Sequence, residues 1–142
     1  MLTDIWTLHE YVQKVEPFVE KLAMGPDGLP PRMDINPDGI WTGQPIICSE
    51  YGGIKSVFSI KKEKEGWGYG DAPKSEDEFY RRLYELTKAL VGMKYMCGYT
   101  YTQLTDVEQE QNGIYNYDRT KKFNMKKVKA VFEMEPEEYK KK

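Results

Sequence analysis

The sequence predicts an α/β fold in which parallel strands are joined by helical crossovers. Three short apolar runs alternate with three stretches of helical spacing along the 142 residues, an order typical of parallel sheets. The middle run, PIICS at residues 45–49, is continuously apolar, as in a strand buried on both faces. The chain length suits one ordinary domain.

The first half of the chain contains two expected strands and one helix. A strand is expected over residues 3–9 (TDIWTLH), and apolar residues at helical spacing predict a helix over 12–24. A loop rich in glycine, proline and aspartate occupies residues 25–43 and leads to the strand at 45–49. A second long loop over 51–74 has no periodicity, and loops of this length are usually functional or disordered.

The second half begins with the clearest helix of the sequence. Ser75 and Glu78 form a capping box, a leucine stripe follows, and Gly92 is expected to end the helix.

A third strand is expected over residues 95–102, followed by a polar loop and a last helix over 125–132. The charged tail, residues 133–142, is expected to fray.

Composition argues against several functional classes. The formal net charge is -2, which provides no electrostatic footprint for nucleic acid or an anionic membrane. No run of about 18 apolar residues exists, and the N-terminal segment lacks the basic and apolar regions of a signal peptide. Localisation stays open. Cys48 and Cys97 lie in apolar runs and are expected to be inert, buried thiols.

Polar residues follow each expected strand, where parallel α/β folds bind ligands. Glu50 is the most informative of them. On pattern alone it is a solvated glutamate, a nucleophile, a general base or a metal ligand. Metal is the poorest fit, because the chain has one histidine and no metal-binding spacing. No phosphate-loop or dinucleotide motif occurs either, so no cofactor is expected.

Three segments carry a resemblance to a known family: PIICSEYGG, GWGYG and CGYTYTQLTDVEQEQNGIYNYDRTKKF. They resemble the C-terminal part of the catalytic barrel of glycoside hydrolase family 2, which includes β-galactosidases, β-glucuronidases and β-mannosidases. The resemblance implies that residues 1–142 are the C-terminal portion of a (β/α)8 TIM barrel, with its strands six to eight. It also implies, as partners, the remaining barrel and the β-sandwich domains of a parent enzyme, and a β-glycoside as substrate.

The resemblance also assigns roles to individual residues. Glu50 matches the family's nucleophile, and Tyr11 matches the tyrosine that hydrogen-bonds and orients it. The implied sugar contacts are His9, Trp67, Tyr101, Gln103 and Asp106. On residue type alone, His9 is more often a structural histidine, and the aromatic segment around Trp67 packs as an ordered loop at least as often as it contacts a ligand.

Two departures from the family pattern limit what the resemblance implies. The acid/base glutamate of the family follows an asparagine, and no Asn-Glu pair occurs here, so the chain alone is expected to be inactive. Glu10 and Glu108 match no known role. The cation that β-glucuronidases place before the glycine matching Gly113 is also missing, which favours a neutral hexoside.

The sequence therefore predicts the nucleophile-bearing portion of a retaining exo-β-glycosidase that hydrolyses terminal β-linked neutral hexosides. One alternative is a non-catalytic carbohydrate-binding remnant, in which Trp67, Tyr69 and Tyr101 would stack on sugar and Glu50 would only hydrogen-bond. The other is a truncated gene fragment that is inactive alone.

Overall fold

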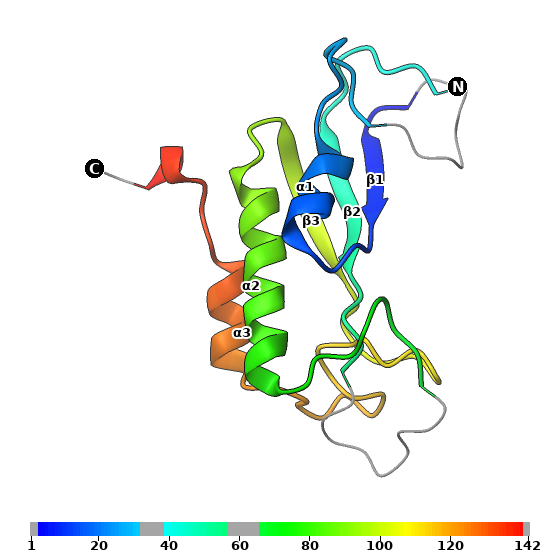
Figure 1. The fold of residues 1–142 in the computed structure, drawn as a ribbon, viewed down its shortest axis with the longest axis vertical. Helices are drawn as coiled ribbons and strands as arrows, with labels where there is room; N and C mark the ends of the chain where they lie inside the picture. The colour runs from blue at the N-terminus through cyan, green and yellow to red at the C-terminus, as the bar shows by residue number, and fades with distance from the viewer. Residues whose placement is uncertain (1–2, 32–38, 57–65, 141–142) are drawn as a thin grey trace.

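The computed structural model describes residues 3–31, 39–56 and 66–140. Strands and helices alternate along the chain (Figure 1). In order they are β1 (Trp6–Glu10), α1 (Val15–Leu22), β2 (Ile46–Gly52), α2 (Glu76–Gly92), β3 (Met96–Thr102) and α3 (Met125–Phe132), followed by a 3-10 turn, Glu137–Tyr139. The predicted mixed α/β class, with one strand before each helix, is confirmed.

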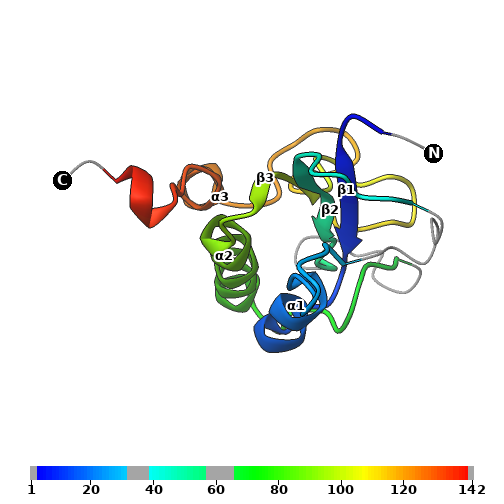
Figure 2. The ribbon, with the colours of Figure 1, turned by 90° about the horizontal axis from the view of Figure 1, so that it is seen from above.

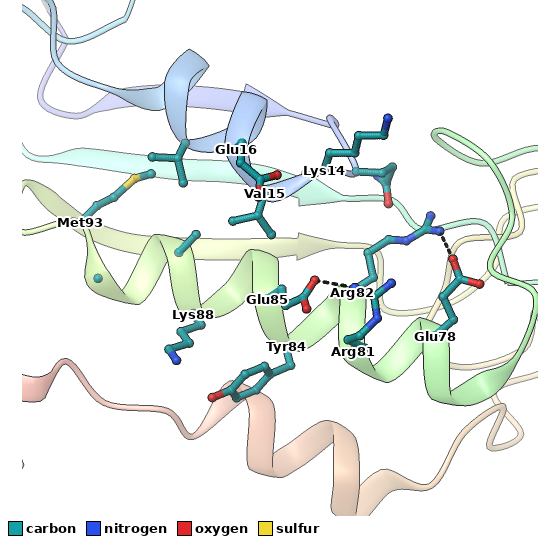
Figure 3. A pocket seen from close by; sticks show the side chains of 14 residues that line it. Lys14, Val15, Glu16, Glu78, Arg81, Arg82, Tyr84, Glu85, Lys88 and Met93 are labelled. Carbon is teal, nitrogen blue, oxygen red and sulfur yellow. Dashed lines mark hydrogen bonds and ion pairs between the residues drawn. The ribbon is translucent and has the colours of Figure 1, made fainter.

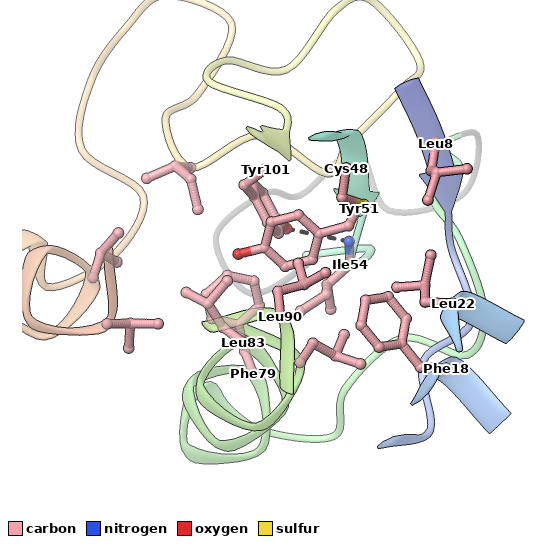
Figure 4. Close-up of a cluster of buried hydrophobic side chains, with 14 of the residues drawn as sticks. Leu8, Phe18, Leu22, Cys48, Tyr51, Ile54, Phe79, Leu83, Leu90 and Tyr101 are labelled. Carbon is pink, nitrogen blue, oxygen red and sulfur yellow. Dashed lines mark hydrogen bonds between the residues drawn. The ribbon is translucent and has the colours of Figure 1, made fainter. Parts of the chain in front are cut away.

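The three strands form one parallel sheet in the order β1-β2-β3. Seen along the strands, α1 and α2 lie on the same side of the sheet, and α3 lies beside α2 (Figure 2). The core fills the space between this side and the helices (Figure 4). Its completely buried apolar side chains are Phe18 from α1, Cys48 and Tyr51 from β2, Ile54, and Phe79, Leu83 and Leu86 from α2.

Helix α1 is shorter than the sequence predicts, and Pro17 accounts for its late start. Proline has no backbone N–H and clashes with the preceding turn, so it is tolerated only in the first turn of a helix. The helix accordingly begins at Val15, two residues before Pro17, rather than at residue 12. It ends at Leu22, since Ala23 already has an extended backbone.

Helices α2 and α3 begin and end where the sequence predicts. Ser75 is the N-cap of α2, and its side chain accepts a hydrogen bond from the backbone N–H of Glu78. Gly92 is the last residue of α2. Helix α3 is capped by Asn124, whose side chain accepts bonds from two backbone N–H groups in the first turn.

A β-bulge in β2 decides where Glu50 points. The pairing with β1 shifts by one residue between Cys48 and Glu50, so Ser49 is the extra residue. Side chains of a regular strand alternate between the two faces, which would place Cys48 and Glu50 together in the core. The bulge instead turns Tyr51 into the core with Cys48, and Glu50 stays partly exposed.

The bulge also lets β2 run further than predicted. The sequence places its end at Ser49, but Tyr51 and Gly52 still pair with β3, opposite Tyr101 and Thr102. Glu50 therefore lies within the strand, close to its carboxyl end, and not in the loop behind it.

The side of the sheet opposite α1 and α2 carries more exposed side chains. The exposed residues on this side include Thr7 from β1, and Cys97 and Thr100 from β3. None of the helices described covers this face (Figure 2). The prediction that Cys97 is buried is therefore wrong, because it belongs to an edge strand and points away from the core.

The charged tail contains one short turn. The 3-10 turn at Glu137–Tyr139 closes through a bond from the Tyr139 N–H to the carbonyl of Pro136. That residues 133–142 fray stays a prediction. Residues 141–142 lie outside the described part of the chain.

A buried ion pair secures the loop that follows β3. Lys122 Nζ lies 2.6 Å from a carboxylate oxygen of Asp106 and 2.9 Å from the hydroxyl of Ser56, and all three residues are buried. The same Asp106 oxygen accepts the backbone N–H of Gly113 at 2.8 Å. Burial lowers the pKa of Lys122, and the Asp106 carboxylate opposes this shift. The loop is thus tied to residues beyond β2 and before α3.

None of the helices in the described ranges is long and apolar enough to cross a bilayer.

The two cysteines are expected to differ in reactivity. Burial raises the pKa of Cys48 to about 12, so its thiol stays protonated and shielded at neutral pH. We expect Ellman's reagent at pH 8 to label one thiol per folded chain, at Cys97, and both thiols in urea. Replacing Cys97 with serine should abolish labelling of the folded chain. Rapid labelling of Cys48 in that variant would contradict the described core.

Replacing Lys122 with methionine should strongly destabilise the fold. The variant leaves the Asp106 carboxylate buried without its cation, which costs roughly 3–5 kcal/mol. Urea denaturation measures the loss. The neighbouring Lys121 is exposed, and its change to methionine is the matched control, with an expected effect within about 0.5 kcal/mol.

The double variant Asp106→Asn/Lys122→Met removes the unpaired charge as well. It should recover part of the lost stability, since the cost lies mainly in the isolated carboxylate. If Lys122→Met were as mild as Lys121→Met, the buried pair would not secure the loop.

Candidate active site at the carboxyl ends of the strands

Three residues predicted from the sequence meet at the carboxyl end of the sheet. The Tyr11 hydroxyl donates a hydrogen bond to Oε2 of Glu50. Nδ1 of His9 lies 3.7 Å from the same oxygen. The side chains of His9 and Glu50 are 33% and 41% exposed, so this carboxylate is open to solvent and to a ligand while one of its oxygens is held.

The site draws on two neighbouring strands. His9 is paired with Glu50 in the ladder between β1 and β2, so the bulge brings the two side chains next to each other. Tyr11 follows the last residue of β1, and its carbonyl accepts a bond of 2.8 Å from Nε2 of Gln13. The same Nε2 donates to the carbonyl of Gly52, which ties the end of β1 to the end of β2.

An aromatic row extends away from Glu50. The rings of Tyr11 and Tyr69 are stacked, with centroids 3.6 Å apart and planes 6° from parallel. Trp67 meets the Tyr69 ring edge-on at 5.7 Å, and 48% of Trp67 is exposed. Trp67, predicted to contact sugar, is therefore accessible at the far end of a row whose first ring, that of Tyr11, hydrogen-bonds Glu50.

The sequence assigns Tyr69 a role only in the carbohydrate-binding alternative, where it would stack on sugar together with Trp67 and Tyr101. Burial, and after it the nearby carboxylates of Glu110 and Glu50, raise the pKa of its hydroxyl. On pattern alone, the GWGYG segment around it is a cluster of aromatic residues and glycines. Nothing in the spacing between Tyr11 and Tyr69 signals their contact, because they are far apart in the chain.

Tyr101 does not lie at this site. It is 9% exposed, and its ring packs edge-on against Tyr51 with centroids 5.6 Å apart. Its hydroxyl accepts the Ile54 N–H at 3.2 Å and donates to the carbonyl of Asn112 at 3.3 Å. The expectation that Tyr101 lies under a sugar ring is corrected, since its place in β3 points it into the helix-covered core.

Asp106 and Gln103 are also engaged elsewhere. The expected contact between Asp106 and sugar is corrected, because its carboxylate is buried and paired with Lys122. Nε2 of Gln103 donates to Oδ1 of the buried Asn112 at 2.9 Å. Nδ2 of Asn112 in turn donates to Glu110 at 2.9 Å. Gln103 thus orders the loop after β3, and none of the hydrogen bonds among the described residues joins it to Glu50.

The two other acidic residues considered from the sequence are not partners of Glu50. Glu10 accepts the Val12 N–H at 2.8 Å and lies 3.6 Å from Lys21 Nζ, so it supports the start of α1. Glu108 is exposed in a tight turn with a positive φ of 51°.

No group of three or more metal-ligating side chains occurs within residues 3–31, 39–56 and 66–140.

A large groove, of about 1010 Å³, lies away from this site, between α1 and α2 (Figure 3). Apolar side chains such as Val15, Val19 and Met93 line it, and charged residues surround it. Its rim includes the Arg82–Glu78 pair at 2.8 Å. None of the converging residues lines the groove, so we place the candidate site by its chemistry and not by the size of the hollow.

Comparisons with known proteins find a similar fold in part of a larger enzyme. No protein-family model and no curated protein matches the chain. Among solved structures, a β-glucuronidase from an uncultured Clostridium species matches 92% of this chain with a TM-score of 0.57 and 18% sequence identity. The β-glucuronidases of Bifidobacterium dentium and Faecalibacterium prausnitzii match 66% each, with TM-scores of 0.45 and 0.42 and identities of 16% and 21%.

These matches cover only a small part of the β-glucuronidases themselves. The chain spans 23% of the Clostridium enzyme and 16% of each of the other two. The chain accordingly shares the fold of a fragment of a bacterial β-glucuronidase.

Proposed function

We propose that this chain is the nucleophile-bearing portion of a retaining exo-β-glycosidase, in which residues 1–142 form the last three β/α units of a catalytic barrel. The observation that carries the proposal is the hydrogen bond from Tyr11 to Glu50 at the carboxyl end of a parallel sheet, with His9 beside it. A partly exposed carboxylate with one oriented oxygen suits a nucleophile. The fold shared with part of a β-glucuronidase supports the same class.

The chemistry proceeds by double displacement. Glu50 attacks the anomeric carbon through Oε1, the carbon–oxygen bond to the leaving group breaks, and a glycosyl ester forms. Tyr11 holds Oε2 and stabilises negative charge when the carboxylate is released again. Water then attacks the anomeric carbon and frees Glu50 with overall retention of configuration.

A second carboxyl group is required at roughly 5–5.5 Å from Glu50 to protonate the leaving oxygen and then activate water. Glu10 and Glu108 do not meet this need, since Glu10 is engaged near α1 and Glu108 sits in an exposed turn. We propose that this group, and the strands that complete the barrel, come from other parts of a longer polypeptide. The isolated chain should then be inactive.

The charge around the site favours a neutral sugar. Both Glu110 and Glu50 lie close enough to Tyr69 to raise the pKa of its hydroxyl, after the larger effect of burial. Lys122 cannot supply a compensating cation, because it is buried against Asp106. A uronic acid carboxylate would meet repulsion here. The second candidate substrate is a β-glucuronide, because the matched Clostridium enzyme is a β-glucuronidase.

A non-catalytic carbohydrate-binding role is the alternative from another class. Trp67 offers an exposed indole at the end of the aromatic row, as a sugar-stacking platform would. In that case Glu50 would only accept hydrogen bonds from sugar hydroxyls.

Glu50→Gln should abolish hydrolysis in the longest polypeptide that the gene encodes. The change keeps the shape but removes the nucleophile, and we expect at least about a 10³-fold loss of kcat. The assay uses 4-nitrophenyl β-galactoside, β-mannoside, β-glucoside and β-glucuronide, with turnover of a neutral hexoside expected. Glu20→Gln, an exposed position on α1, is the matched control and should retain full activity.

Azide provides a second, chemically specific readout. In a Glu50→Ala variant, azide should occupy the vacated space, restore turnover with an activated glycoside and give the α-glycosyl azide. Unchanged hydrolysis by Glu50→Gln would overturn the assignment of the nucleophile. Binding of these sugars without turnover in the complete polypeptide would favour the carbohydrate-binding alternative.

A further inference from the structure

The position of the Tyr11 ring is the starting point, since its hydroxyl must reach Glu50. Tyr11 lies one residue beyond β1, where the ladder no longer holds the chain. A bond from Gln13 to its carbonyl fixes its backbone but not the rotation of its ring. The contact that defines the ring plane is the stack on Tyr69, at 3.6 Å and 6°.

Tyr69 is itself held by backbone contacts on both sides. Its N–H donates to the carbonyl of Gly53 at 2.8 Å, in a bridge next to Ile54. Two residues earlier, Trp67 exchanges bonds of 2.7 Å with Gln109 and Gln111. The segment that carries Tyr69 therefore lies between the end of β2 and the loop after β3, and its position does not depend on Tyr11.

Gly53 brings the two rings together. Its φ of 56° lies in the left-handed region, and it follows Gly52 at the end of β2. A side-chain carbon at Gly53 would overlap the Tyr69 ring and lie 3.2 Å from Cδ1 of Tyr11. The absence of a side chain lets both rings lie over the backbone directly behind Glu50.

We propose that Tyr69 is a positioning residue, which holds the Tyr11 ring in the orientation that directs its hydroxyl to Glu50. Tyr69 acts through the face of its ring, so its hydroxyl is dispensable for this role. Aromatic pairs of this kind shift a conformational equilibrium by about two- to tenfold. The significance for catalysis rests on the proposed function, whereas the positioning itself is a property of the chain and is measured without substrate.

The test follows the Tyr11 hydroxyl proton by NMR in the 142-residue chain, with the signal assigned by its loss in Tyr11→Phe. Tyr69→Leu removes the stacked ring and should accelerate exchange of this proton with water by about two- to tenfold. Tyr69→Phe keeps the ring and should match the wild-type rate. Tyr84→Leu, at an exposed tyrosine of α2, is the matched control and should leave the rate unchanged.

Either of two results would overturn the proposal. One is a wild-type exchange rate in Tyr69→Leu, and the other is equally fast exchange in Tyr69→Phe, which would assign the effect to the hydroxyl. The backbone amide spectrum shows whether Tyr69→Leu folds. If it does not fold, the stack is tested in the wild-type chain instead. Cross-relaxation between the ring protons of Tyr11 and Tyr69 is expected, and its absence also overturns the stack.

These outcomes are independent of the test of hydrolysis. If Tyr69 positions Tyr11 but the complete polypeptide hydrolyses no glycoside, the proposed function is overturned and the positioning role is not. Hydrolysis that depends on Glu50, together with an unchanged proton in Tyr69→Leu, would remove only the positioning role.

Discussion

The extra residue in β2 is the constraint on which the arrangement of the site depends. Parallel strands alternate their side chains, and Cys48 must point into the core that the helices cover. Without the bulge, Glu50 would follow it into a core of apolar side chains, where burying an unpaired ionised carboxylate costs a large amount of free energy. Ser49, the extra residue of the bulge, lets Cys48 point into the core while Glu50 points away from it. Tyr51 then takes the buried position, and Glu50 reaches His9 and Tyr11 at the edge of the sheet.

Two kinds of interaction support this geometry: the apolar layer between the sheet and the helices, and a buried ion pair beyond the strands. The apolar layer between the sheet and the helices holds the strands in register, with Tyr51 hydrogen-bonded at 2.6 Å to the buried Thr87 of α2. Beyond the strands, where regular pairing ends, the Lys122–Asp106 pair fixes the loop after β3. Trp67 is bonded to that loop, so a buried charge pair indirectly supports the aromatic row next to Glu50.

Local patterns predicted the class of fold and the bounds of α2 and α3 well, because caps and periodicity act over a few residues. Ser75 and Gly92 bound α2 as expected, and the convergence of His9, Tyr11 and Glu50 follows from strand ends that meet at one edge. The roles expected for Tyr101 and Asp106 failed for a different reason. The face to which Tyr101 points depends on bulges between β2 and β3. The burial of Asp106, in the loop after β3, depends on its pairing with Lys122 further along the chain. No local pattern records either feature.

Gly53 has a consequence for how this surface can change over evolution. Its backbone conformation and the space taken by the Tyr69 ring both exclude a side chain. A substitution at either position therefore changes what the other can be. Relatives with a larger residue in place of Gly53 should also have lost the ring at the position of Tyr69, and with it the support of Tyr11. The glycine, the two tyrosines and Glu50 should be inherited as one unit, although they are spread over three separate segments of the chain.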